Sequence, residues 1–260
     1  MQQLSTDRQD QIERFIREHR RATVVELSQF FKVSEPTIRR DLEKLESSGK
    51  VRRSHGGALA LESAAPEPPV LQRLQDCAEE KYQIGQAAAH LVRDGETIFL
   101  GSGTTTLEVA RNLTFKKNLT VITNALTVAN QLAGNENINL IVTGGVLRHS
   151  EASLTGHLVE QTLKELRADK VIISIRSISI QEGLTSDDFL ETMTDRAILG
   201  FARQVILVAD HTKFDKTSTV RVAPITAVQT IVTGDKVPAE TVRQIQELGI
   251  EVIQANTETT

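Results

Sequence analysis

Residues 34–45 constrain the fold of this chain most strongly, because their pattern predicts a short amphipathic helix that can enter a DNA groove. Ile38, Leu42 and Leu45 recur at helical spacing, so one face of the helix is buried. Ser34 can cap the start of the helix. Arginines on such a helix can bind guanine edges or grip phosphate in the major groove. The cap and the other faces supply the candidate DNA contacts, which are Ser34, Thr37, Arg39, Arg40 and Lys44.

The residues on either side of this helix predict a winged helix-turn-helix. Apolar side chains at helical spacing predict two further helices, over residues 7–19 and 24–31. Two short strands around Arg52 and Arg53 complete the motif as a basic wing. The alternative is a small helical bundle whose charged faces are only solvated. The wing adds three candidate DNA contacts, which are Arg52, Arg53 and His55.

These segments and a series of later motifs resemble the DeoR family of bacterial transcription regulators. The matching N-terminal segments are residues 33–45 and 55–58. The later motifs follow in the family's order, at residues 101–106, 121–124, 144–145, 169–170 and 210–214. The resemblance covers nearly the whole chain. It implies a DNA-binding head followed by a domain that resembles ribose-phosphate isomerases and senses a phosphorylated sugar.

The charge of the chain divides unevenly along its length. Residues 1–60 hold 12 Lys/Arg and 9 Asp/Glu, so their net charge is +3. The remaining residues carry −7, and the two parts sum to the net charge of −4. This asymmetry suits a DNA-facing head on an acidic body. One cysteine excludes an internal disulfide, and the six histidines lack ligand spacing, so we expect no metal and no cofactor. Without a signal peptide or a bilayer-spanning apolar run, we expect a cytoplasmic protein with no membrane partner.

The chain is expected to contain two domains and a stiff linker. Three prolines among residues 66–69 predict an extended segment. We therefore expect a DNA-binding domain over residues 1–60, a linker over 61–78 and an effector-binding α/β domain over 79–260. The last domain alternates helices with short Val/Ile/Leu-rich runs, which predicts a mostly parallel, Rossmann-like sheet covered on both faces. The expected strands are residues 97–100, 119–122, 139–142, 170–175, 205–208, 228–232 and 251–253.

Ligands of such a sheet bind beyond the carboxyl ends of its strands. The first strand is followed by the Gly-Ser-Gly-Thr-Thr-Thr motif of residues 101–106, whose glycines, hydroxyls and helix-start N–H groups suit an anion. Its alternative is a tight strand-to-helix turn. Arg148 could neutralise an anion or be a surface charge. Further strand ends carry polar residues or glycines whose alternatives are caps, turns and solvated loops, namely Thr123, Asn124, Gly144, Gly145, Asp210 and Lys213.

The family resemblance implies which of these residues hold the effector. The phosphate would be bound by Gly101, Ser102, Gly103, Thr104 and Thr105, with polar contacts from Thr123, Asn124, Gly145 and Lys213. Lys81 enters by its family position, and Glu191 keeps a familiar acid. The chain departs from the family at Arg176, where a Gly- and Asp-containing turn is usual, and at Asp195, where lysine is more frequent. Arg176 would therefore add its charge to the crevice.

Two functions of different classes remain at this point. The first is a sequence-specific DNA-binding regulator, expected to repress a carbohydrate-metabolism operon until a phosphorylated sugar relieves it. The alternative is a phosphosugar isomerase-like enzyme with a DNA-binding head, for which Glu191 is the candidate proton-transfer group. We favour binding without turnover. Because one recognition helix reads few base pairs, we expect a double-stranded operator with paired half-sites and a homo-oligomer, a dimer or tetramer.

Overall fold

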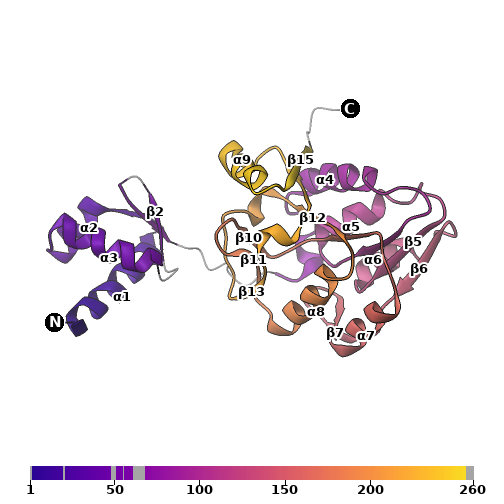
Figure 1. Cartoon of the computed structure of the whole chain (residues 1–260), viewed down its shortest axis with the longest axis horizontal. Coiled ribbons are helices and arrows are strands. Elements are labelled where there is room, and N and C mark those ends of the chain that lie inside the picture. The colour runs from indigo at the N-terminus through magenta and orange to yellow at the C-terminus, as the bar shows by residue number, and fades with distance from the viewer. Residues whose placement is uncertain (1, 20, 48–50, 55, 61–67, 256–260) are drawn as a thin grey trace. The chain divides into compact units, whose positions relative to one another are not determined.

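The computed structural model describes residues 2–19, 21–47, 51–54, 56–60 and 68–255. His55 and residues 61–67 of the expected linker lie outside these ranges. Contacts divide the chain into two compact units, Met1–Ala65 and Pro66–Thr260 (Figure 1). The finer division at residues 60 and 78 stays a prediction. No helix of the described ranges combines the length and the apolar character that crossing a bilayer requires.

The first unit is a winged helix-turn-helix, as the sequence predicts. Strand β3 lies between β1 and β2, and both neighbours run antiparallel to it. Strand β1 was not predicted, because three residues between two helices carry too little pattern to detect. The elements are α1 (Gln2–His19), β1 (Arg21–Thr23), α2 (Val24–Phe31), α3 (Glu35–Ser47), β2 (Val51–Ser54) and β3 (Gly57–Ala60).

Local signals in the sequence set the ends of α2. Thr23 and Glu26 form a capping box, in which each side chain accepts a hydrogen bond from the other residue's backbone N–H. Lys32 ends the helix in the left-handed conformation, with φ 52°. The helix then packs Leu27 into a core that also contains Ile12 and Ile38. This core fixes the turn that leads into α3.

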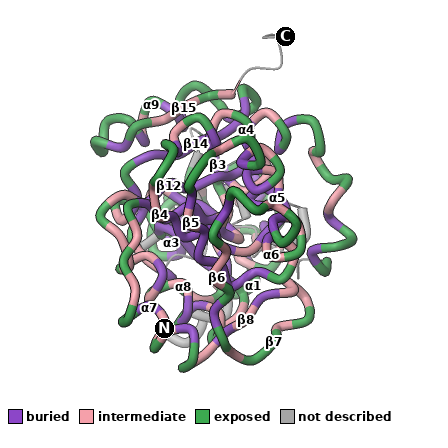
Figure 2. Tube along the Cα trace, turned by 90° about the vertical axis from the view of Figure 1, so that its right-hand side faces the viewer, coloured by how far each residue is buried: buried purple, intermediate pink, exposed green. Residues whose placement is uncertain are grey.

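The second unit is built on a seven-stranded sheet in which every strand pair is parallel. Its strand order is β15-β14-β12-β9-β4-β5-β6. The predicted parallel sheet is thus confirmed, and its central strands are buried (Figure 2). The strands are β4 (Thr97–Leu100), β5 (Leu119–Thr123), β6 (Ile138–Val142), β9 (Lys170–Ile173), β12 (Gln204–Ala209), β14 (Thr230–Gly234) and β15 (Glu251–Ala255).

Helices cover both faces of this sheet. Alternate side chains of one strand enter opposite clusters: Ile98 packs with the first helix set and Phe99 with the second. The first set is α4 (Ala78–His90), α5 (Thr104–Arg111) and α6 (Leu126–Leu132), and the second is α7 (His157–Glu165), α8 (Phe189–Leu199) and α9 (Ala239–Glu247).

Short antiparallel strands and 3-10 turns were missed by the sequence prediction. A small sheet has the order β10-β11-β13, and β7 pairs with β8 as a hairpin. Runs of three or four residues are too short for alternation to reveal. These strands are β7 (Val146–Arg148), β8 (Ser153–Thr155), β10 (Ser177–Ser179), β11 (Gly183–Ser186) and β13 (Val220–Ala223), and the turns are η1 (Val70–Arg73), η2 (His211–Lys213) and η3 (Ile225–Ala227).

Candidate functional site

Helix α3 presents a basic, solvent-facing surface. Ile38 and Leu42 are fully buried, whereas Arg39 and Arg40 lie on other faces of the helix and are exposed. The Arg39 guanidinium lies 3.2 Å from the Glu35 carboxylate one turn earlier, an exposed pair that contributes little to stability. Both arginines are therefore accessible to a ligand in solution. Of the other candidates on this helix, Lys44 is exposed and Thr37 is half-buried.

The start of α3 is organised by Ser34. Its carbonyl accepts hydrogen bonds from the N–H groups of Thr37 and Ile38, at 2.9 and 3.1 Å. Its hydroxyl shares a 2.9 Å hydrogen bond with the Thr37 hydroxyl. Both hydroxyls are thus held at the N-terminal end of α3. In a recognition helix, this is the end that contacts the bases.

Buried Asp41 fixes α3 against α1. Its carboxylate accepts hydrogen bonds from Arg8 Nε at 2.7 Å and Gln9 Nε2 at 3.0 Å. The sequence prediction missed this contact because Asp41 reads as one more solvated charge. Such an anchor gives the recognition helix a defined orientation within its unit.

The wing brings Arg53 next to α3. Arg53 is exposed on β2, and its Nη1 lies 3.3 Å from the Glu43 carboxylate. Arg52 pairs with Leu59 in the β2–β3 ladder. The side chain of Arg52 and the whole of His55 lie outside the described residues, so their DNA contacts stay predictions.

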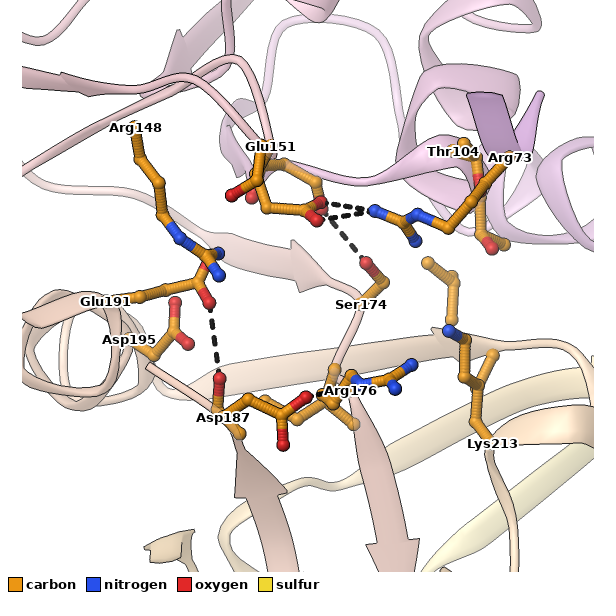
Figure 3. Close-up of a pocket in the computed structure, with 17 residues that line it drawn as sticks. Arg73, Thr104, Arg148, Glu151, Ser174, Arg176, Asp187, Glu191, Asp195 and Lys213 are labelled. Atoms are coloured by element: carbon orange, nitrogen blue, oxygen red, sulfur yellow. Dashed lines mark hydrogen bonds and ion pairs between the residues drawn. The ribbon is translucent and has the colours of Figure 1, made fainter. Parts of the chain in front are cut away.

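A pocket of the second unit opens where the strand order of the main sheet reverses. Strands β4 and β9 are neighbours, but the chain continues from them in opposite directions across the sheet. Such a switch point is the usual ligand position in parallel α/β folds. The pocket, drawn in Figure 3, is lined by Arg73, Ser102, Thr104, Thr105, Arg148, Ser150, Glu151, Ser174, Ile175, Arg176, Ser186, Asp187, Glu191, Asp195, Val208, Ala209 and Lys213.

The loop after β4 forms one wall of this pocket. Gly103 caps α5 with φ 121°, and a Cβ atom there would lie only 2.2 Å from Ser174 Oγ. Ser174 in turn donates a 2.9 Å hydrogen bond to the carbonyl of Ser102. The loop thus needs glycine at position 103, while Gly101 lies against Ile173. The predicted effector residues that line the pocket are Ser102, Thr104, Thr105, Arg148, Arg176, Glu191 and Lys213.

The predicted residues at the ends of β5 and β6 lie outside this lining. The β7–β8 hairpin covers them: Asn124 Nδ2 donates to the Leu154 carbonyl at 3.0 Å, and Leu154 N–H donates to the Asn124 carbonyl at 2.7 Å. Thr123 Oγ1 donates to the Leu100 carbonyl at 2.6 Å. Gly145 packs against Thr155 in the hairpin. Gly144 lies against Leu158 of α7, so these four positions contact the protein itself: Asn124 and Gly145 contact the hairpin, and Thr123 and Gly144 contact β4 and α7.

Lys81 and Asp210 lie outside the pocket lining and hold segments that carry lining residues. Lys81 is buried, and its Nζ donates a 3.1 Å hydrogen bond to the carbonyl of Arg73. Burial lowers the pKa of Lys81. Asp210 accepts the Thr212 N–H at 2.9 Å and so shapes the turn that carries Lys213. Both residues position lining side chains, which family position alone did not reveal.

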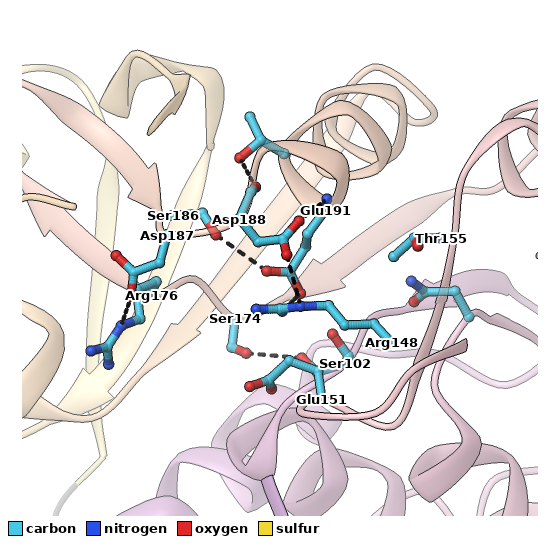
Figure 4. Close-up of polar contacts among 12 residues, drawn as sticks. Ser102, Arg148, Glu151, Thr155, Ser174, Arg176, Ser186, Asp187, Asp188 and Glu191 are labelled. Atoms are coloured by element: carbon cyan, nitrogen blue, oxygen red, sulfur yellow. Dashed lines mark hydrogen bonds and ion pairs between the residues drawn. The ribbon is translucent and has the colours of Figure 1, made fainter. Parts of the chain in front are cut away.

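Two paired arginines in the lining show how the pocket is held together. Arg73 lies 2.5 and 2.6 Å from the two carboxylate oxygens of Glu151, and both side chains are nearly buried. Arg148, on β7, lies 2.5 Å from Glu191 (Figure 4). Arg73 and Glu151 were missed because Arg73 lies within the expected linker and Glu151 lies in a hairpin loop, and no motif marks either residue.

Helix α8 contributes two carboxyl groups one turn apart. Burial raises the pKa of the Glu191 carboxyl from 4.5 to about 7, against the opposing effect of Arg148. Burial and the charge of Glu191 raise the pKa of Asp195 well above its usual range. Asp195 follows Glu191 by four residues, and this spacing places both side chains on the same face of the helix. The pocket therefore contains two neighbouring carboxyl groups whose pKa values are both raised, to about 7 for Glu191.

A separate group of potential metal ligands lies beside α4. The ligand atoms of Cys77, Glu80 and His211 lie within 4.8 Å of one another, close enough to hold an ion. The Glu80 carboxylate already accepts the His211 backbone N–H at 2.8 Å and lies 2.6 Å from its Nδ1. These contacts tie the β12–η2 connection to α4. The expected absence of a metal stays a prediction.

Known proteins resemble the chain over nearly its whole length. The DeoR-like helix-turn-helix domain matches residues 8–64, and the DeoR C terminal sensor domain matches residues 76–235. The glycerol-3-phosphate regulon repressor of Escherichia coli (strain K12) is 35% identical over 92% of this chain and 94% of its own. The putative aga operon transcriptional repressor of Escherichia coli O157:H7 is 31% identical over 96% and 93%. Among solved structures, ribose 5-phosphate isomerase A of Methanocaldococcus jannaschii aligns with 54% of this chain and 55% of its own, at TM-score 0.40 and 17% identity.

Proposed function

Because the chain belongs to the DeoR family of bacterial transcription regulators, we propose that it represses a carbohydrate-use operon and is released by a phosphorylated sugar. Relatives named as repressors of the aga operon and of a glycerol-3-phosphate regulon support this assignment. The partners of the proposed complex are a double-stranded operator and the sugar phosphate. A dimer or tetramer would place two recognition helices on paired half-sites.

The pocket wall after β4 carries the proposal for the phosphate. Thr104 and Thr105 are the first residues of α5, where backbone N–H groups have no intrahelical acceptor. A helix N-terminus of this kind favours an anion. The hydroxyls of Ser102, Thr104 and Thr105 add donors, and Lys213 lines the same pocket. We assign the phosphate to this end of the pocket.

Substitution of Lys213 tests the assignment. Lys213→Gln removes one positive charge from the pocket, so the concentration of sugar phosphate that releases the operator should rise at least tenfold. Lys216→Gln is the matched control, because Lys216 lies three residues later and outside the pocket lining. A thermal-shift screen of sugar phosphates selects the ligand, and an operator titration with each variant gives the response. An unchanged response in Lys213→Gln would remove the phosphate from this end.

The isomerase alternative has one observation in its favour. Glu191 lines the pocket with a pKa of about 7, which suits proton transfer at neutral pH. Against it, Arg148 lies 2.5 Å from one Glu191 oxygen, and Ser186 donates to the other at 3.2 Å. We therefore propose binding without turnover. Incubation of bound sugar phosphates in D₂O, followed by NMR, tests this: deuterium incorporation at a sugar carbon would identify an enzyme.

A further inference from the structure

The two ends of the pocket differ in chemistry. In Figure 3, Thr104 and Lys213 lie on the right, whereas Arg148, Glu191 and Asp195 lie on the left. The right-hand end offers hydroxyl and ammonium donors, which match a phosphate. The left-hand end is dominated by carboxyl groups. If the phosphate of a sugar phosphate binds at the right-hand end, the far end of its sugar therefore faces these carboxyl groups.

The acidic end has more carboxyl groups than nearby cations. Arg148 is shared by Glu191 at 2.5 Å and Asp188 at 3.5 Å, and Arg176 pairs with Asp187 at 2.9 Å. Asp195 also lines the pocket, and its carboxyl group makes no hydrogen bond to any residue of the described ranges. Asp195 is thus a partly exposed, pocket-facing acceptor to which no side chain of the described residues donates.

The neighbouring arginine cannot compensate for this deficit. Arg73 also lines the pocket, but its guanidinium holds both carboxylate oxygens of Glu151. Burial and the charge of Glu191 raise the pKa of Asp195, and the charge of Arg148 opposes them without cancelling them. A positively charged ligand group would supply the missing charge and allow Asp195 and Glu191 to ionise together.

We propose that the effector is an aminated sugar phosphate, whose ammonium group binds between Glu191 and Asp195 while its phosphate binds at Thr104, Thr105 and Lys213. The inference rests on the proposed function and narrows its ligand class. An ammonium group donates three hydrogen bonds and carries the charge that this end lacks, whereas a sugar hydroxyl carries none. Asp195 is therefore the residue that selects amine over hydroxyl.

Calorimetric titration of the full-length protein with matched ligands tests this selection. The probes are glucosamine 6-phosphate and galactosamine 6-phosphate, each compared with its parent hexose 6-phosphate and its N-acetyl derivative. We expect an amine to bind at least tenfold more tightly than the corresponding hydroxyl or amide. Asp195→Asn should reduce the ratio of amine to hydroxyl affinity to near one. It should still bind the parent hexose 6-phosphate, which has no amino group. Glu182→Gln, an exposed carboxyl outside the lining, is the charge-matched control.

The outcomes separate this inference from the proposed function. Sugar phosphates that bind and release the operator with no preference for the amine would overturn the inference and leave the function standing. A preference that survives in Asp195→Asn would overturn the assignment of Asp195. Absence of binding by every sugar phosphate would overturn both. Operator binding by Asp195→Asn, measured in parallel, shows that the variant is folded.

Discussion

The two units of this protein present their arginines in opposite ways. On α3, Arg39 and Arg40 project from an exposed helix face. In the pocket, Arg73 and Arg148 have side chains only 8% and 22% exposed, and each is held by a carboxylate. Arginines that bind a DNA groove can stay exposed and solvated until the DNA arrives. A small-molecule pocket must keep cations in place before the ligand arrives, and burial then requires acids beside them.

The largest expected effect comes from the glycine that keeps the pocket open. Gly103→Ala places a Cβ against Ser174 at a φ that L-residues rarely adopt, so we expect loss of the response to sugar phosphate and about 1–3 kcal/mol of destabilisation. Gly134→Ala is the control, because a Cβ there meets nothing within 4 Å. Operator titrations with and without ligand, and chemical denaturation, measure the two effects. Equal behaviour of the two variants would contradict the tight packing of this loop.

The arginines of α3 should separate into two roles. Adjacent helix residues point about 100° apart, so we expect one of Arg39 and Arg40 to read a base and the other to hold phosphate. Alanine at the base reader should cost about 1–3 kcal/mol and relax one operator position. Alanine at the phosphate partner should weaken all sequences alike and reduce the salt dependence. Fluorescence anisotropy on operator variants distinguishes them, and full operator binding by both variants would contradict the helix assignment.

The acid pair should make the stability of the second unit depend on pH. A carboxyl with a raised folded-state pKa stabilises the fold below its ordinary pKa, and this contribution is lost as pH rises through the folded-state value, about 7 for Glu191. Asp195→Asn removes one such group. Without ligand, its melting temperature relative to the native protein should therefore increase from pH 5 to pH 8, by about 2–4 °C for ~1 kcal/mol. A constant difference across that range would contradict an ionisable, buried Asp195.

The smallest expected effect concerns the wing. Arg53 is exposed beside Glu43, so it is available to the DNA backbone but contributes little within the protein. Arg52→Ala combined with Arg53→Ala should reduce operator affinity about threefold to tenfold, as expected for loss of phosphate contacts. Binding of sugar phosphate should not change. A loss of ligand binding in this double variant would show that the two units do not act separately.

The exposure of the α3 arginines was easier to predict from the sequence than the contacts inside the pocket. Burial of Ile38 and Leu42 leaves Arg39 and Arg40 exposed, and periodicity detects both facts at once. The glycine-rich loop was also detectable, because Gly103 marks a local backbone requirement. By contrast, the partners Arg73 and Glu151 are 78 residues apart, and only the folded sheet and hairpin bring them together.

The predicted residues at the ends of β5 and β6 lie outside the pocket lining for a related reason. Thr123 and Asn124 follow a parallel strand, as a ligand-binding residue would. The strands of the β7–β8 hairpin are three residues each, so the sequence did not reveal the element that occupies the space beyond them. Asn124 binds this hairpin where a ligand was expected. Short elements decide which strand ends stay open.

The attachment of η1 has a consequence for how the pocket communicates. Val70 N–H donates a 2.7 Å hydrogen bond to the Ser150 carbonyl, and Arg73 grips the adjacent Glu151. Ser150, Glu151 and Arg73 all belong to the pocket wall. The η1 turn, which follows the DNA-binding unit in the sequence, is therefore bonded to residues of the wall that a ligand in the pocket would contact. Ligand binding and the attachment of η1 thus involve the same residues, so a ligand that rearranges these residues also alters the attachment of η1.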